Sequence, residues 1–366
     1  MPLTEETLYQ IALAKTVHIG PSIGRTLLDE YGSAREVFKA PKKELVKISK
    51  ITERIVNNLA DNVALKRAEQ ELKFIEKHDI QVHFISDREY PRRLKFCKDA
   101  PLCIFTKGLM DLNAEKMVAV VGTRKATPYG KEQTEKIVSE LAQHNVTIIS
   151  GLAFGIDITA HRTAQENNLQ TAAVLAHGLD RIYPREHTQT AKRMLENGGL
   201  ITDYWSGTNP DMGNFPERNR IIAGLCDATL VMESRLQGGS LITGKLAFKY
   251  NRDVFAFPGK STDNNSRGCN FLIKSHQAAL IEDVKDIEYQ MGWEKSKKKK
   301  KVQKKLFVEL SEEEQSILDL LKDKKLAVDE IGLELNKSSS QISTHLFNLE
   351  MNGLIKSLPG KMYQLN

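Results

Sequence analysis

Seven short apolar segments between residues 117 and 281 constrain the fold more than any other feature of the chain. Amphipathic stretches separate them, and this alternation is typical of an α/β domain with an extended, Rossmann-like parallel sheet. Several segments are apolar throughout, as expected of strands that are covered on both faces. The predicted strands are 117–121, 146–150, 171–176, 199–202, 228–233, 253–258 and a short edge strand at 278–281.

The segment before this sheet is predicted to be helical. Residues 1–75 have the pattern of an N-terminal helical module of the helix-hairpin-helix or SAM-like type, with Gly20 and Pro21 in a tight turn. A second, degenerate hairpin follows the first. Such hairpins either bind DNA phosphates through backbone N–H groups or serve as packing modules, and the sequence leaves both roles open. Residues 76–290 are then the Rossmann-like core.

The end of the chain predicts a winged-helix domain over residues 310–366. Its first helix opens with a capping-box pattern, Ser311 followed by Glu314. Further helices are expected at 328–335 and 339–352, with a wing around Pro359 and Gly360. The last of these helices offers polar side chains but no Arg or Lys, so weak base reading and protein interaction both remain open.

The positive net charge is concentrated in one segment. The chain carries a net charge of +6, but the predicted linker 291–309 contains eight lysines between residues 295 and 305. Without these eight lysines, 45 basic residues face 47 acidic ones, a net charge of −2. A binding site for a polyanion in the folded parts must therefore be a local cluster.

Composition excludes several other classes of protein. The four cysteines are scattered, so neither a metal site nor a disulfide framework is expected, and a reducing cytoplasm fits. The N-terminal residues lack the pattern of a signal peptide. No apolar run approaches the ~18 residues that a membrane span requires. We expect a cytoplasmic protein with no cofactor and no membrane partner.

Glycine-containing loops follow several of the predicted strands, where ligands bind in open α/β sheets. Loop amides at a helix start can bind anions, and arginine can bind a phosphate through two N–H groups. The spacing of the second loop is not that of a dinucleotide fingerprint. The predicted contacts in these loops are Gly122, Thr123, Arg124, Gly151, Ala153, Gly155, Gln237, Gly238, Gly239, Ser240 and Thr243.

A further candidate cluster lies in "FPERNRIIAGL", where Arg218, Asn219 and Arg220 are expected to open a helix. A catalytic interpretation rests on Asp157 and His161, which lie four residues apart on one helical face. The pair has no third group and no nucleophile, and the chain has no Walker lysine. We therefore favour a structural explanation, in which Asp157 caps the helix and braces the loop and His161 packs against the neighbouring strand.

The motifs described above make the chain similar to a known family. Residues 117–281 are similar to the DNA-processing protein A family (DprA, also called Smf) of bacterial natural transformation. The matching stretches, in family order, are "VAVVGTR", "SGLAFGIDITAH", "VLAHGLDRIYP", "FPERNRIIAGL", "GGSLIT", "VFAFPG" and "GCNFLI". The resemblance implies a non-enzymatic, homodimeric protein that binds single-stranded DNA and helps load the RecA recombinase, displacing or bypassing single-strand-binding protein.

Two features depart from the family pattern. Similar proteins place a basic residue directly before the glycine–serine block, whereas this chain has Gln237. Either Arg235 or Lys245 substitutes for it, or the affinity for DNA is lower. The loop "ITDYWSGTNPDMGN" is also longer and more polar than usual. The aromatic residues in and after it either stack on bases or pack inside the protein. They are Tyr204, Trp205 and Phe215.

Two alternative functions compete with single-strand binding. One is a Rossmann-like nucleotide-processing enzyme of the N-glycosidase type, in which Asp157 or Glu233 would act on a mononucleotide. The other is a ligand-sensing transcription regulator, suggested by the winged helix. Product analysis with a nucleotide panel would identify the enzyme, and preference for one duplex sequence would identify the regulator.

Overall fold

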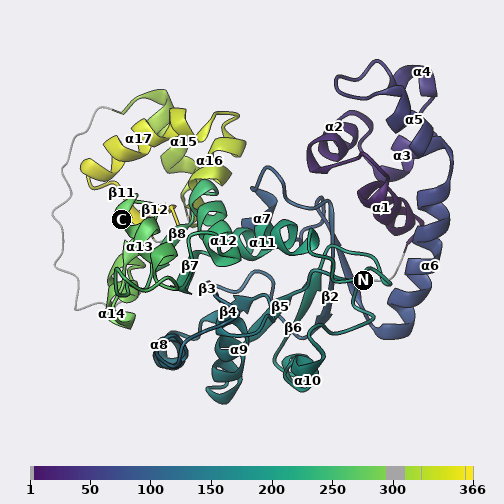
Figure 1. Cartoon of the computed structure of the whole chain (residues 1–366). Helices are drawn as coiled ribbons and strands as arrows, with labels where there is room; N and C mark the ends of the chain where they lie inside the picture. Colours follow the sequence, from purple (N-terminus) through teal and green to yellow (C-terminus); the bar gives the residue numbers. More distant parts are fainter. Residues whose placement is uncertain (1–3, 294–309, 323, 359, 366) are drawn as a thin grey trace.

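The computed structural model describes residues 4–293, 310–322, 324–358 and 360–365. Three units follow one another along the chain: helices at the N-terminus, a sheet with helices on both faces, and a small domain at the C-terminus (Figure 1). Of the predicted linker 291–309, residues 294–309 lie outside the described residues, as does Pro359 in the predicted wing. No helix in the described part of the chain is long and apolar enough to cross a membrane.

The central sheet has nine strands in the order β1-β2-β6-β5-β4-β3-β7-β8-β9. The seven strands predicted from the apolar segments are confirmed as a parallel series, β3 to β9. Two antiparallel strands precede them. The strands are β1 (Gln81–Phe84), β2 (Cys103–Gly108), β3 (Met117–Gly122), β4 (Thr147–Ser150), β5 (Thr171–Val174), β6 (Gly198–Thr202), β7 (Ala228–Glu233), β8 (Asp253–Ala256) and β9 (Ala279–Leu280).

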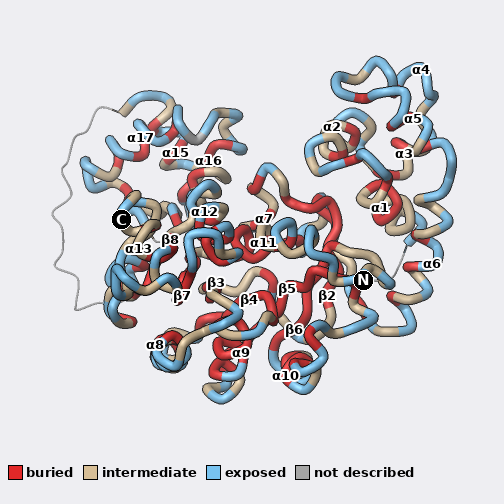
Figure 2. The backbone as a smooth tube through the Cα atoms, viewed as in Figure 1, coloured by how far each residue is buried: buried red, intermediate tan, exposed pale blue. Residues whose placement is uncertain are grey.

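Helices cover both faces of this sheet, and the central strands are buried between them (Figure 2). Alternate residues of β3 face opposite sides: Val118 and Val120 join one apolar cluster, and Ala119 and Val121 join the other. This explains why the strand sequences are apolar throughout. The helices of the core are α7 (Arg92–Lys95), α8 (Pro128–Leu141), α9 (Ile156–Glu166), α10 (Thr188–Met194), α11 (Asn214–Leu225), α12 (Gly239–Lys249), α13 (Arg267–Lys274) and α14 (Val284–Gln290).

The helical module at the N-terminus packs on the side of the sheet where β1 and β2 lie (Figure 1). Gly20 is the cap residue of α2 and Pro21 its first residue, a position suited to the fixed φ of proline. The Arg25 guanidinium donates to the carbonyls of Lys95 and Cys97, which fixes α2 to the core. The helices are α1 (Glu5–Lys15), α2 (Pro21–Tyr31), α3 (Ala34–Lys39), α4 (Lys42–Leu45), α5 (Glu53–Ala60) and α6 (Val63–His78).

The C-terminal domain is a winged helix with its own apolar core. The capping box of Ser311 and Glu314 is present at the start of the first helix. On the wing, the Gly360 amide donates to Asp253, and Lys361 donates to Asn251, so the wing contacts the sheet where β8 begins. Its elements are α15 (Glu312–Leu320), β10 (Leu326–Ala327), α16 (Val328–Glu334), α17 (Ser339–Met351), β11 (Ile355–Leu358) and β12 (Met362–Leu365).

Candidate nucleic-acid interface

A groove of about 640 Å³ opens at the carboxyl ends of β3 and β7. Along the sequence, β4, β5 and β6 follow one another on one side of β3. The chain then crosses back, and β7, β8 and β9 follow one another on the other side of β3. The groove therefore lies at the topological switch point, where open α/β sheets bind ligands. Its walls include these predicted residues: Gly122, Thr123, Arg124, Ala153, Arg218, Asn219, Gln237, Gly238, Gly239, Ser240 and Thr243.

Arg124 presents an accessible positive charge at this groove. The residue is exposed, and its guanidinium lies 4.7 Å from the centre of the Phe215 ring. Within the described residues, no carboxylate forms an ion pair with it. A guanidinium stacked on an aromatic face is oriented yet keeps its N–H groups available for an anion.

The N-terminus of α12 contributes partial positive charge to the same groove. Its cap residue Gly238 makes no side-chain hydrogen bond to the helix, so the first N–H groups remain open to a ligand. Ser240 is the second residue of the helix, and its hydroxyl donates to the Ser234 hydroxyl at 2.9 Å. Asn219 spans the gap from α11 and donates to the Gly239 carbonyl at 3.4 Å.

The basic residue beside Gln237 is Arg235. It lines the groove, and its Nε donates to Asn265 at 2.8 Å. Lys245, the other expected substitute, does not line the groove; its ammonium lies 5.1 Å from the centre of the Phe271 ring. Of the two expected substitutes, Arg235 is therefore the one that lies at the groove.

The loop after β4 lies beside the groove, and two of its amides are hydrogen-bonded inside the protein. The amides of Gly151 and Ala153 donate to Oδ2 of Asp157, at 3.1 and 3.4 Å, and so are already satisfied. Gly155 has a φ of +77°, and a Cβ there would lie 2.2 Å from the Thr123 carbonyl oxygen. Neither Gly151 nor Gly155 lines the groove. Gly155 lets two loops pack closely, and Gly151 leaves room for the Arg218 and Asp157 side chains. Their role as phosphate contacts stays a prediction.

Arg218 is a buried support and not an exposed phosphate contact. It is 4% exposed, and its Nη1 donates to the carbonyls of Gly151, at 3.0 Å, and Val174. Burial lowers the pKa of Arg218 to about 10, while the nearby Asp157 opposes this shift. Burial raises the pKa of Asp157, and Arg218 opposes that shift in turn. The two side chains stabilise the loop from below.

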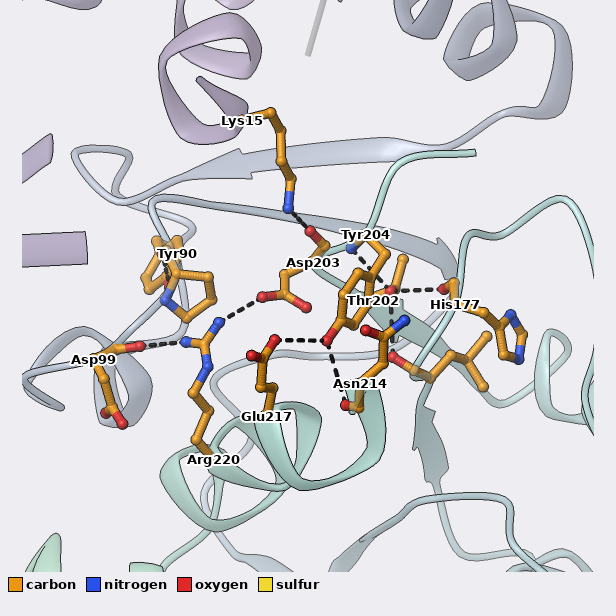
Figure 3. A network of polar contacts seen from close by, with 12 residues as sticks. Lys15, Tyr90, Asp99, His177, Thr202, Asp203, Tyr204, Asn214, Glu217 and Arg220 are labelled. Atoms are coloured by element: carbon orange, nitrogen blue, oxygen red, sulfur yellow. Dashed lines mark hydrogen bonds and ion pairs between the residues drawn. The ribbon is translucent and has the colours of Figure 1, made fainter. Parts of the chain in front are cut away.

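Arg220 points away from the groove. Its guanidinium pairs with Asp203 at 2.5 Å and donates to the Asp99 carbonyl, while Lys15 donates to the Asp203 carbonyl (Figure 3). The network connects α11 to the N-terminal module. The expectation that residues 218–220 open a helix is also wrong, because α11 begins one turn earlier, at Asn214.

The candidate catalytic side chains act as structural supports. His161 is buried, its Nδ1 lies 2.7 Å from the Thr171 hydroxyl on β5, and burial lowers its pKa to about 3. Glu233 accepts from the Thr127 amide at 2.9 Å and does not line the groove. In the described part of the chain, no three His, Cys, Asp or Glu side chains gather in a way that could hold a metal ion.

The three aromatic residues that could stack on bases lie in different places. Phe215 lines the groove, whereas Tyr204 hydrogen-bonds to Glu217 and Trp205 stacks under the Arg67 guanidinium of the N-terminal module. Met212 and Ile242 also line the groove and were not predicted from the sequence. Their signal was weak, because isolated apolar residues in loops and on helices are common.

Comparison with known proteins shows to which family the chain belongs. A model of the family described as DNA recombination-mediator protein A matches residues 81–292, more than half of the chain. The chain belongs to this family. A second family model, the DprA winged helix domain, matches residues 308–361.

Relatives with this family's names cover most of the chain. Protein Smf of Escherichia coli is 32% identical over 306 residues, which is 82% of this chain and 81% of that protein. Protein Smf of Synechocystis is 32% identical over 285 residues, 76% of this chain and 71% of that protein. The DNA processing protein DprA of Streptococcus pneumoniae is 40% identical over 203 residues, 56% of this chain and 71% of that protein.

Solved structures confirm the α/β fold. The X-ray structure of DprA from Streptococcus pneumoniae matches with a TM-score of 0.68 and 31% identity, covering 79% of this chain and 99% of that one. DprA from Helicobacter pylori matches with a TM-score of 0.51 and 30% identity, covering 57% of this chain and 94% of that one. The latter structure is titled for its single-stranded DNA binding mode.

Proposed function

We propose that this protein binds single-stranded DNA in the groove between β3 and β7. The observation that carries the proposal is the convergence of Arg124, Arg235 and the uncapped start of α12 on one groove. Asp157 is the one acidic side chain among its lining residues, and it accepts the Gly151 and Ala153 amides. The groove is thus a local site for successive phosphates in a chain whose positive charge lies mostly elsewhere.

Phosphate contacts of this kind position a strand without reading its sequence. Binding should therefore tolerate different base sequences and weaken as salt rises, because each neutralised phosphate releases counterions. The relative from Helicobacter pylori, which is titled for single-stranded DNA binding, supports the same choice of ligand.

The decisive experiment is a fluorescence anisotropy titration of the full chain with matched single- and double-stranded oligonucleotides over a salt series. We expect tighter binding to the single strand and a slope of roughly −0.7 in log K against log salt for each phosphate contacted. Tighter binding to the duplex at every salt concentration would contradict the proposal.

At the level of the pathway, we propose a cytoplasmic homodimer that acts as a recombination mediator in natural transformation. It would help load RecA on incoming single strands covered by single-strand-binding protein. The family description and the names of the relatives support this role. The test is the rate at which RecA filaments form on single-strand-binding-protein-coated DNA. Wild-type protein should raise that rate, and Arg124→Ala should raise it less.

We further propose that the protein acts by binding and not by catalysis. The two carboxylates that an N-glycosidase would use make hydrogen bonds inside the protein: Asp157 accepts loop amides, and Oε2 of Glu233 accepts the Thr127 amide at the start of α8. Incubation with a nucleotide panel should give no product. Turnover that Glu233→Gln abolishes would favour the enzyme.

A further inference from the structure

A second cavity, of about 610 Å³, lies between the core and the winged-helix domain. Its core wall comes from α7, from the residues directly before β3, β7 and β8, and from the end of α14. Its other wall comes from the start of α16 and from the wing. This interdomain cavity is therefore at the amino ends of the strands, opposite the groove, and DNA binding in the groove does not explain it.

Aromatic and apolar side chains form part of the cavity wall. Trp293 is half-buried, and the ammonium of Lys116 lies 5.3 Å from the centre of its ring. Phe96 lines the cavity from the core, and Leu358 and Met362 line it from the wing. Apolar and aromatic surfaces that converge with charged groups on a cavity of this size are typical of a site for one small organic molecule.

The same cavity presents positive charge that the protein does not neutralise. Five basic and four acidic side chains line it, and one of each is consumed by a pair. In this pair, Arg93 donates to both carboxylate oxygens of Asp227, at 2.6 and 2.9 Å. The other basic side chains form no ion pair in the parts of the chain that the structure describes; they are Arg92, Lys116, Arg252 and Lys325.

Arg252 and Glu330 add detail to this charge balance. The Nη2 of Arg252 donates to the Arg93 carbonyl at 2.7 Å, and its buried Nε has no hydrogen-bond partner among the described residues. Buried donors without a partner are uncommon in folded proteins. Glu330, one of the remaining acids, already accepts the Ala327 amide at 2.8 Å. The groups that still lack partners in the cavity are thus mainly donors and cations, which favour an anion.

Flat aromatic walls and free cations together restrict the class of ligand. A nucleoside phosphate carries a planar ring that packs on Trp and Phe and phosphates that bind Arg and Lys. Inorganic phosphate would satisfy the cations but leave both aromatic rings uncovered, and a neutral aromatic compound would do the reverse. The volume is that of sites for single small molecules, so a free nucleotide fits better than a DNA strand.

We propose that the interdomain cavity binds a free nucleoside phosphate. Its ring would lie against Trp293 and Phe96. Its phosphates would lie near Arg92 of the core and Lys325 of the winged-helix domain. Because these walls belong to two domains, the bound nucleotide stabilises the arrangement in which the wing lies against the sheet.

The two tryptophans of the chain allow a direct test. Trp293 lines the cavity, whereas Trp205 stacks under the Arg67 guanidinium of the N-terminal module. In a full-length Trp205→Phe protein, tryptophan fluorescence therefore reports on the cavity alone. The probe is ADP, and the comparison ligands are adenosine, which lacks the phosphates, and pyrophosphate, which lacks the ring. A Trp293→Phe protein, which keeps only Trp205, is the blank.

We expect ADP to change the fluorescence of Trp293 saturably and to bind roughly tenfold more tightly than adenosine or pyrophosphate, since each of these lacks one set of contacts. Adding Arg92→Ala should weaken the binding of ADP and pyrophosphate by about tenfold and leave that of adenosine unchanged. Lys98→Ala is the matched control, because Lys98 is exposed in the same segment and does not line the cavity. Thermal unfolding of each variant verifies that it is folded.

Three results would overturn the proposal: no saturable change with ADP, equal affinity for ADP in Arg92→Ala and its parent, or an equal loss in Lys98→Ala. A second titration adds ADP in the presence of saturating oligothymidylate. Unchanged affinity for ADP supports a separate nucleotide site, and displacement of ADP would assign the cavity to a DNA strand and overturn the proposal. Failure of oligothymidylate to bind at all would remove the proposed function and leave the ADP result standing.

Discussion

The groove at the carboxyl ends of β3 and β7 and the winged-helix domain are two regions whose folds commonly hold nucleic acid, and their net charges are opposite in sign. Three arginines and one aspartate line the groove. Residues 310–366 contain nine acidic and six basic residues, a net charge of −3. The helix α17, which would enter a DNA groove, carries Glu350 but no Arg or Lys. The groove is therefore a better binding site for phosphates than the winged-helix domain.

Position reinforces this difference. The groove lies at the carboxyl ends of β3 and β7, whereas the wing contacts Asp253 and Asn251 at the beginning of β8. Because β3, β7 and β8 are parallel, the groove and the wing lie at opposite ends of these strands. In this arrangement, a DNA strand bound in the groove would have to pass along the whole length of the sheet strands to reach the winged helix. A fold that often binds DNA is thus not by itself evidence of a DNA site.

The largest expected effect comes from Arg218, which supports the groove and has no counterpart in the winged helix. Arg218→Met leaves the carbonyls of Gly151 and Val174 without their donor and Asp157 without its neighbouring charge. Removing one partner of a buried charged network costs about 3–5 kcal/mol. Urea unfolding should show this loss, and single-strand binding should fall with it. Lys125→Ala, an exposed change nearby, is the control; equal stability of both variants would contradict the buried role.

Arg124→Ala should separate binding from stability. Loss of one charge-assisted contact is expected to weaken single-strand binding by about 1–3 kcal/mol. The free energy of unfolding should stay the same, since Arg124 is exposed. Anisotropy and urea unfolding measure the two effects, with Lys125→Ala again as the matched control. Unchanged affinity would remove Arg124 from the site and with it much of the contrast between groove and winged helix.

The contrast between Arg218 and Arg124 also shows what sequence can predict. The apolar runs predicted β3 to β9, and the capping-box pattern of Ser311 and Glu314 predicted the start of α15. The burial of Arg218 was missed although a signal existed. Residues 221, 222 and 225 follow it at spacings of three, four and seven, so a helix places Arg218 on their buried face.

Other features had no such signal. The amides of Gly151 and Ala153 looked free in sequence, and only the folded loop shows that Asp157 accepts from both. The strands β1 and β2 are short and antiparallel, and the pairing of β2 with the distant β6 depends on tertiary contacts. Whether a glycine serves a ligand or a neighbouring loop is decided by packing, as the contact between Gly155 and Thr123 shows.

Acid should destabilise the core through His161. Burial lowers the pKa of His161 to about 3, from an ordinary value of 6.5, so the unfolded state binds more protons between these values. Stability is therefore complete above pH 6.5 and decreases as pH falls, by about 1.5 kcal/mol at pH 5.5 for this group. Urea unfolding at pH 7.5 and 5.5 should show a smaller difference for His161→Asn. An equal difference in both proteins would assign the acid sensitivity to other groups.

The smallest expected effect concerns the winged-helix domain. Deleting residues 311–366 should change single-strand affinity by less than about 0.5 kcal/mol, the typical range for changes away from a site. The core should stay folded because the winged helix has its own apolar cluster around Ile331 and Leu346 and contacts the core through the wing. A full-length variant, Gln341→Ala with Asn348→Ala, changes exposed polar side chains of α17 without removing the domain. If anisotropy shows loss of affinity in both proteins, α17 contacts DNA and the acidic domain is a second site. A loss restricted to the deletion would instead indicate that the wing stabilises the sheet edge at Asp253.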